Sequence, residues 1–256
     1  MVFAGQQEID DSRPFFYLVA VPAILIYGIG KGGFGGAIGS ISVPMMSLTI
    51  SPIQAAAILL PILIVMDIFA VKHHYRTANY SVIRSMLAWA IIGIVVAGLL
   101  LDLLSIHLIK ALIGGISVLF CCLYWFGISG HAFFKHPKWR IIWSCLCGFS
   151  STAIHSGGGP ATIYLLPLKL DKVVLVSTMA VLFAILNGIK LVPYGMLGSF
   201  SKENLMTAFV LAPLAPIGVY LGVWLLHRVS EKFIYQVCYV CLLVFGTKLL
   251  LEGILL

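Results

Sequence analysis

This sequence has few charged residues. Asp, Glu, Lys and Arg make up only 10% of the 256 residues, whereas hydrophobic types make up 61%, and the mean hydropathy is +1.08. A water-soluble globule needs far more polar surface, so a soluble fold is excluded and a lipid bilayer is the expected solvent. The first residues also lack the basic flank of a cleavable signal peptide, and we expect a short polar tail there.

Clusters of metal-binding side chains are also lacking. The six cysteines include the pairs Cys145/Cys147 and Cys238/Cys241, but both pairs lie within apolar runs and no clustered histidine accompanies them. We expect these cysteines to pack, and we predict neither a metal site nor a cofactor. The net charge of +7 does not indicate nucleic-acid binding, because the basic residues are dispersed between apolar runs instead of forming one patch.

About ten apolar runs are present, and the longer ones, of about 15 to 25 residues, suit helices that cross a hydrocarbon core of about 30 Å. We therefore predict an all-α integral membrane protein. One plan occurs twice: a run, a glycine-rich break, a short run and three further runs, which indicates an internal duplication. The runs are 15–30, 37–50, 53–71, 86–104 and 108–129, then 139–155, 160–168, 173–197, 205–226 and 233–255. The predicted parts are a polar tail (1–14), a first repeat (15–130), a loop (131–138) and a second repeat (139–256).

The two repeats are predicted to be inverted relative to each other. If each glycine-broken pair enters and leaves on one side, as a re-entrant hairpin or as two crossings, each half crosses the membrane an odd number of times. Inverted repeats of this kind are typical of secondary transporters. Cytoplasmic loops retain Lys and Arg, and under this topology ten basic residues lie on one side and three on the other, which places both termini away from the cytoplasm. The ten are Lys72, Arg76, Arg84, Lys135, Lys138, Arg140, Lys169, Lys172, Arg228 and Lys232, and the three are Arg13, Lys110 and Lys202.

The glycine-rich breaks GKGGFGG (30–36) and SGGGP (156–160) stand at corresponding places in the two halves. Glycine allows a ligand to approach the backbone closely, and the N–H groups at the start of the following short helix attract an anion. The alternative is that these glycines only permit tight helix packing. On the first interpretation the predicted substrate contacts are Gly32, Gly33, Gly35, Gly36, Ser156, Gly157, Gly158 and Gly159.

Ionisable residues within apolar runs are functional candidates, because a charge is costly in lipid. Lys31 lies within the first break and could bind an anion or reach the headgroups. Asn187, Lys190 and Tyr194 follow i, i+3, i+7 spacing and so share one helix face, which could line a polar chamber. Lys190 also lies close enough to the end of its run to snorkel to the interface.

Two further candidates are Asp67 and His155. Ser51 and Asp171 are probable helix caps by residue type, and Asp67 and Asn187 lie 16 positions beyond them (67 − 51 and 187 − 171). Asp67 could couple transport to protons, neutralise Lys31, or form a purely structural ion pair with Lys72, which is near in sequence. His155 precedes the second break and could titrate, donate to an anion, or serve only a structural purpose.

These motifs resemble the sulfite exporter TauE/SafE family of membrane permeases. The resemblance rests on GKGGFGG followed by Pro44, and on SGGGP followed by Pro167, Asn187, Lys190 and Tyr194, and it covers nearly the whole chain. It implies outward transport of small sulfur-containing anions, such as sulfite, sulfoacetate or other organosulfonates, across the bacterial inner membrane.

The sequence thus predicts a secondary transporter rather than an enzyme, with a small anion and the lipid bilayer as its partners. The rivals are a membrane-embedded hydrolase using Asp67 and His155, for which no nucleophile or metal set can be assembled, and a non-transporting scaffold. Whether the protein forms a homodimer is left open.

Overall fold

The computed structural model contains helices and no strand among the residues that it describes, which are 14–34, 37–103, 105–127, 137–165, 168–226, 228 and 231–255. This confirms the all-α prediction. The predicted polar tail (1–14) and inter-repeat loop (131–138) lie almost wholly outside the described residues.

Every predicted apolar run contains helix. The helices of the first half are α1 (Pro14–Gly33), the 3₁₀ helix η2 (Ala37–Ile41), α2 (Ser42–Met46), α3 (Pro52–His74), α4 (Tyr80–Leu103) and α5 (Ile106–Trp125). Those of the second half are α6 (Pro137–Ile154), α7 (Gly158–Leu165), α8 (Lys172–Met196), α9 (Lys202–Leu211), α10 (Leu214–Leu225) and α11 (Glu231–Leu255). The run 205–226, predicted as a single segment, is divided into α9 and α10, which are bent by 44° at a break that contains Pro213.

Capping side chains determine where α3 and α8 begin. The Ser51 hydroxyl accepts a hydrogen bond from the backbone N–H of Gln54 (3.2 Å), and the Asp171 carboxylate accepts one from the N–H of Val173 (2.9 Å). Both predicted caps are therefore confirmed, and each satisfies an N–H group that has no acceptor within its helix.

The helices are long enough to cross a bilayer. Among the described residues, α1, α3, α4 and α8 are apolar spans of 19 to 25 residues, and the bent pair α9–α10 makes a fifth if it is one span. At 1.5 Å per residue such helices measure roughly 28–38 Å, which matches the hydrocarbon core. The chain is thus a multi-pass membrane protein.

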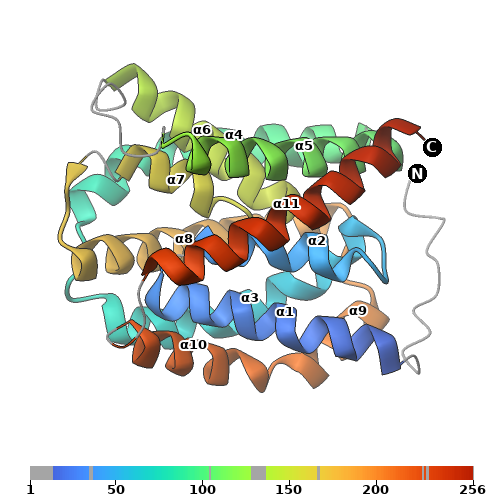
Figure 1. Cartoon of the computed structure of the whole chain (residues 1–256), viewed down its shortest axis with the longest axis horizontal. Coiled ribbons are helices and arrows are strands. Elements are labelled where there is room, and N and C mark those ends of the chain that lie inside the picture. Colours follow the sequence, from blue (N-terminus) through green and yellow to red (C-terminus); the bar gives the residue numbers. More distant parts are fainter. Residues whose placement is uncertain are drawn as a thin grey trace.

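Helices of one half pack mainly against helices of the other. α1 packs against α10, α4 against α6, α5 against α11, and α3 against α8. Figure 1 shows the long helices running roughly along the long axis of the molecule, and α3 and α8 each bury more than half of their apolar window. The paired helices α3 and α8 therefore lie at the centre of the bundle.

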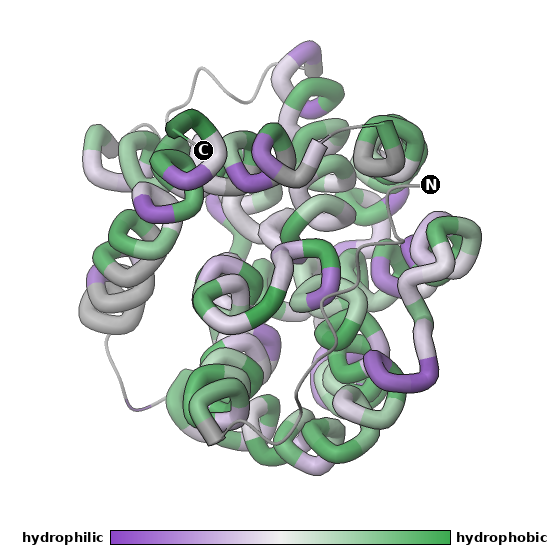
Figure 2. Tube along the Cα trace, turned by 90° about the vertical axis from the view of Figure 1, so that its right-hand side faces the viewer, coloured by the Kyte–Doolittle hydropathy of each residue, from purple (hydrophilic) through white to green (hydrophobic). Residues whose placement is uncertain are grey.

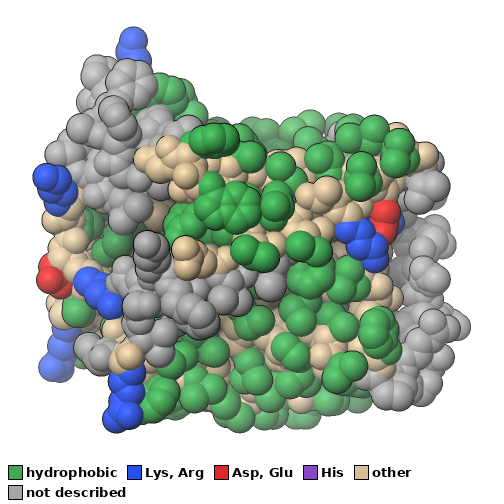
Figure 3. All heavy atoms as spheres, viewed as in Figure 1, with side chains coloured by type: hydrophobic (Ala, Val, Ile, Leu, Met, Phe, Trp, Pro, Cys, Tyr) green, Lys and Arg blue, Asp and Glu red, His purple; other side chains and the backbone are tan. Residues whose placement is uncertain are grey.

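The outer surface is apolar along most of its length. Large hydrophobic side chains such as Leu99 on α4 and Trp224 on α10 are exposed, and hydrophobic colouring predominates around the periphery in Figure 2. On the face shown in Figure 3, most of the Lys and Arg side chains lie at the left end, beyond a broad hydrophobic band. Such a band is what a hydrocarbon core requires.

Glycines allow the helices of the two halves to approach closely. A Cβ on Gly148 of α6 would overlap the carbonyl oxygen of Ala90 in α4, and a Cβ on Gly93 of α4 would overlap that of Cys145 in α6. The backbones of α4 and α6 are therefore in direct contact, as small residues permit in membrane bundles.

This contact predicts the outcome of a matched pair of substitutions. Gly148→Ala forces α4 and α6 apart, and we expect it to lower the free energy of unfolding in detergent by about 1–3 kcal/mol, the usual cost of overpacking. Gly188→Ala is the control, because a Cβ there meets no atom within 4 Å and alanine favours a helix. Thermal unfolding midpoints compare the two variants, and equal midpoints would contradict the proposed contact.

Candidate functional site

The two central helices run antiparallel and bring polar residues together. Near the end of α3, His74 Nδ1 lies 3.1 Å from Ser177 Oγ in the first part of α8. Earlier in α3, Asp67 meets Asn187, which lies further along α8. The contacts occur in opposite order along the two helices, so Asp67 and Asn187, which the capping residues align in the two halves, face each other across the centre of the bundle.

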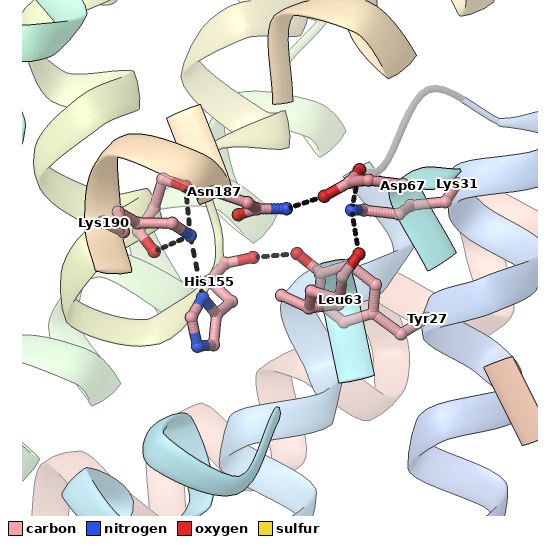
Figure 4. Close-up of polar contacts among 8 residues, drawn as sticks. Tyr27, Lys31, Leu63, Asp67, His155, Asn187 and Lys190 are labelled. Carbon is pink, nitrogen blue, oxygen red and sulfur yellow. Dashed lines mark hydrogen bonds and ion pairs between the residues drawn. The ribbon is translucent and has the colours of Figure 1, made fainter. Parts of the chain in front are cut away.

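The first buried cluster surrounds Lys31. Its Nζ forms an ion pair with Asp67 and donates to the carbonyl oxygen of Leu63 (3.2 Å), while Asn187 Nδ2 donates to the other Asp67 oxygen (2.6 Å). Figure 4 shows these contacts. The three side chains are buried, so Lys31 does not reach the headgroups. Of the interpretations of Asp67, neutralisation of Lys31 is the one that the geometry bears out; proton coupling stays a prediction.

The second buried cluster surrounds Lys190, which is 0% exposed and therefore does not snorkel. Its Nζ lies 3.0 Å from the Ser151 carbonyl oxygen, 3.1 Å from Ser151 Oγ and 2.9 Å from His155 Nδ1. The ammonium group has three N–H donors, so its hydrogen bonds are complete. All three acceptors are neutral, and no carboxylate in the described part of the chain lies within 4.0 Å of it.

His155 connects this cluster to the first half of the chain. Its Nε2 lies 2.9 Å from the carbonyl oxygen of Ala56, which can only accept, so Nε2 holds the proton and Nδ1 accepts from Lys190. Its own carbonyl oxygen accepts a hydrogen bond from Tyr27 Oη (2.7 Å). His155 is thus a neutral tautomer with a hydrogen bond at each ring nitrogen. It is therefore not available as a general base for the hydrolase alternative.

The backbone of His155 adopts a left-handed conformation (φ 53°) at the end of α6. The N–H of His155 donates to the Ser151 carbonyl and that of Ser156 to the Ser150 carbonyl, and both N···O distances are 3.1 Å. These bonds end the helix at a left-handed residue, a position that glycine usually takes. A histidine in this region is uncommon and costs conformational energy. Its bonds to Ala56, Lys190 and Tyr27 offset that cost.

Tyr194 completes the polar face of α8. Its hydroxyl donates to the Thr152 carbonyl oxygen (2.6 Å), and its ring stacks on that of His155 with centroids 5.8 Å apart. Asn187, Lys190 and Tyr194 are all buried, in agreement with the predicted shared face, although Asn187 contacts α3 whereas the other two contact α6.

The second glycine break lies beside Lys190. Gly157 is tightly enclosed, since a Cβ there would lie 2.8 Å from Ser151, Phe183 and the Cys147 carbonyl oxygen. Gly158 and Gly159 form the first turn of α7, whose N–H groups have no acceptor within the helix. The Ser156 hydroxyl, 1% exposed, has no hydrogen-bond partner. A buried hydroxyl without a partner is costly and requires an explanation, which a ligand would provide.

The first glycine motif departs from its prediction. α1 continues without a break through Gly33, so Lys31 lies within a helix and the interruption begins only after that residue. A Cβ on Gly32 or Gly33 would overlap a backbone carbonyl oxygen of α10, at Val219 or Gly222. Helix packing, the alternative considered for these glycines, accounts for both. Gly35 and Gly36 lie outside the described residues, as does Pro167, and substrate contact by these glycines stays a prediction.

Sequence reasoning missed Ser151 and Tyr27, which contact the predicted site residues directly. Each had a signal. Tyr27 precedes Lys31 by one helical turn and therefore shares its face. The caps Ser51 and Asp171 set an offset of 120 positions between the halves, and this offset aligns Ser151 with Lys31 (171 − 51 and 151 − 31).

No group of metal-binding side chains occurs among the described residues. Cys145 and Cys147 are free thiols within α6, and Cys147 is completely buried. The side chains of Cys238 and Cys241 lie outside the described part of the structure.

A family model described as sulfite exporter TauE/SafE matches residues 20–249, nearly the whole chain. The match includes both buried clusters and both glycine motifs. Comparison with curated proteins and with solved structures gave no match.

The position of His155 predicts a marked effect of its removal. His155→Ala removes one of the three acceptors of Lys190 and the side-chain donor to the Ala56 carbonyl, and we expect it to lower the free energy of unfolding by about 1–3 kcal/mol for each lost contact. His107→Ala is the control, because His107 is exposed, and a change within about 0.5 kcal/mol is expected. Denaturant unfolding in detergent measures both, and similar losses would contradict the linking role of His155.

Proposed function

The chain belongs to the sulfite exporter TauE/SafE family, a family of membrane transporters and not of enzymes, and on this premise we propose that it is a secondary transporter of small sulfur-containing anions. The proposed substrates are sulfite, sulfoacetate or other organosulfonates. The proposed location is the bacterial inner membrane, and the proposed direction is outward.

The observation that supports an anionic substrate most strongly is that Lys190 is buried with no carboxylate of the described residues beside it. A buried cation that hydrogen-bonds only to neutral groups lacks electrostatic compensation, and removal of an ion from water costs several kcal/mol. Such residues in membrane proteins mark ion or substrate pathways. A bound anion supplies the missing charge.

The proposed binding site therefore lies where Lys190 meets the second glycine break. An oxyanion there replaces one of the three neutral acceptors of the Lys190 ammonium, and it also accepts hydrogen bonds from the unpartnered Ser156 hydroxyl and from the N–H groups at the start of α7. Asn187 and Tyr194 extend the site along α8, and Lys31 lies on the opposite side, neutralised by Asp67.

We propose that two inverted repeats build this site. His74 is hydrogen-bonded to the Gly32 carbonyl (Nε2 to O, 3.0 Å), and Tyr194 is hydrogen-bonded to the Thr152 carbonyl (Oη to O, 2.6 Å). Both members of the second pair lie 120 positions after those of the first (194 − 74 and 152 − 32), so equivalent contacts recur in each half. The antiparallel course of α3 and α8, which hold equivalent places, supports inversion. Inverted repeats bind substrate at their interface.

We propose that this arrangement supports alternating access. One end of the bundle is closed by His74 with Gly32 and by Thr77 with Ser177 (Oγ1 to Oγ, 2.6 Å). Toward the other end, His155 is bound to Ala56. Both closures are present together, as in an occluded state, and we propose that they open in turn as one repeat rocks against the other.

Export of an anion requires no further energy source under this proposal. A negative cell interior favours outward movement by about 2.3 kcal/mol per charge per 100 mV. Proton coupling through Asp67 is therefore an option and not a necessity.

Flux measurements on Lys190 test the proposed function. We expect Lys190→Gln to reduce uptake of radiolabelled sulfite into proteoliposomes at least about tenfold, because a charge-assisted hydrogen bond contributes about 1.5–3 kcal/mol. Lys248→Gln is the matched control, because Lys248 is exposed and pairs with Glu252 (3.6 Å) away from the site, and its flux should equal that of the wild type.

Two results would contradict the proposal in different ways. Wild-type flux of sulfite and of organosulfonates equal to that of empty liposomes would exclude transport and favour a scaffold. Strong wild-type flux that Lys190→Gln leaves unchanged would remove Lys190 from the site.

A further inference from the structure

The buried charges of the bundle do not balance. Among the described residues, the buried ionisable side chains other than Tyr and Cys are Lys31, Asp67, Lys190, His74 and His155. Asp67 neutralises Lys31 through their ion pair, and no carboxylate is left for Lys190. With both lysines protonated, the centre of the bundle therefore holds one positive charge in excess.

The two histidines do not alter this count. His155 is a neutral tautomer, because its Nε2 donates to a carbonyl oxygen and its Nδ1 accepts from Lys190. His74 Nε2 donates to the Gly32 carbonyl, and the Ser177 hydroxyl can donate to its Nδ1, so a neutral imidazole satisfies both contacts. The excess is thus a single unit charge.

We propose that Asp67 is a specificity-determining residue that restricts the transported substrate to singly charged anions. This inference rests on the proposed function and narrows its substrate class. By neutralising Lys31, Asp67 leaves Lys190 as the only buried lysine of the described residues that a substrate can pair with. The preferred substrates are then hydrogensulfite and singly charged alkanesulfonates, whereas sulfate and the sulfite dianion are disfavoured. Sulfoacetate, which carries two charges, is removed from the substrates proposed above.

The physical reason is the low polarity of the surroundings. A singly charged anion beside Lys190 leaves the occluded site neutral, whereas a dianion leaves one unpaired negative charge in the membrane interior. The Asp67 carboxylate is itself negative and therefore repels a second negative charge. It also keeps Lys31 and Asn187 occupied, because it accepts a hydrogen bond from each. Lys31 is therefore unavailable to a dianion while Asp67 is ionised.

The test compares methanesulfonate with sulfate, which are tetrahedral anions of similar size with one and two negative charges. Initial rates of uptake of the two radiolabelled ions are measured at neutral pH in proteoliposomes, and the readout is their ratio within each protein. A ratio is insensitive to how much of a variant folds. For the wild type we expect methanesulfonate to exceed sulfate by at least about tenfold.

Three variants change the charge of the site in steps. Asp67→Asn frees Lys31 and raises the excess to two charges, so the ratio should fall at least about tenfold toward sulfate. The double variant Lys31→Gln with Asp67→Asn removes the pair, restores the excess of one charge and should regain the wild-type ratio. Lys190→Gln removes the excess and should lose uptake of both anions.

The outcomes separate the two proposals. If the wild type moves neither anion, the proposed function and this inference fall together. If it moves anions but the ratio is the same in the wild type, Asp67→Asn and the double variant, transport stands and the charge restriction is overturned. A ratio that falls in Asp67→Asn and recovers in the double variant supports the restriction.

Discussion

A bilayer interior offers neither water nor counter-ions, and this constraint accounts for the arrangement of nearly every polar group in the bundle. Helices satisfy the backbone, and buried side chains must satisfy one another. Lys31 meets this demand with Asp67, and Asp67 in turn binds Asn187 of the other half. Lys190 has three hydrogen-bond acceptors, but all of them are neutral, so no partner carries an opposite charge. The account of function follows from that difference.

The two halves carry different polar side chains at aligned positions. At the offset of 120 positions, Lys31 corresponds to Ser151 and Asp67 to Asn187, so the first half places an ion pair where the second has neutral groups. The second half adds Lys190 one turn further along α8. Under the proposed inverted repeats, equivalent helices thus carry different charges in the two halves.

Much of this arrangement could be predicted from the sequence, because apolar runs of membrane length allow few alternatives to helices. The caps Ser51 and Asp171 were predicted from residue type alone. The bend between α9 and α10 was missed, because hydropathy is continuous across it. The first break was placed too early, because glycine is a poor helix former in isolation, whereas Gly32 and Gly33 gain close contact with α10. Ser151 was missed because a serine in an apolar helix gives no signal of its own.

The most direct test of the central claim is an experimental structure of the protein bound to a heavy-atom anion, such as selenite in place of sulfite. The account predicts that the anion lies within hydrogen-bond distance of Lys190 Nζ and of the first N–H groups of α7, and that Lys31 remains paired with Asp67. An anion bound elsewhere, with Lys190 still held only by Ser151 and His155, would contradict it.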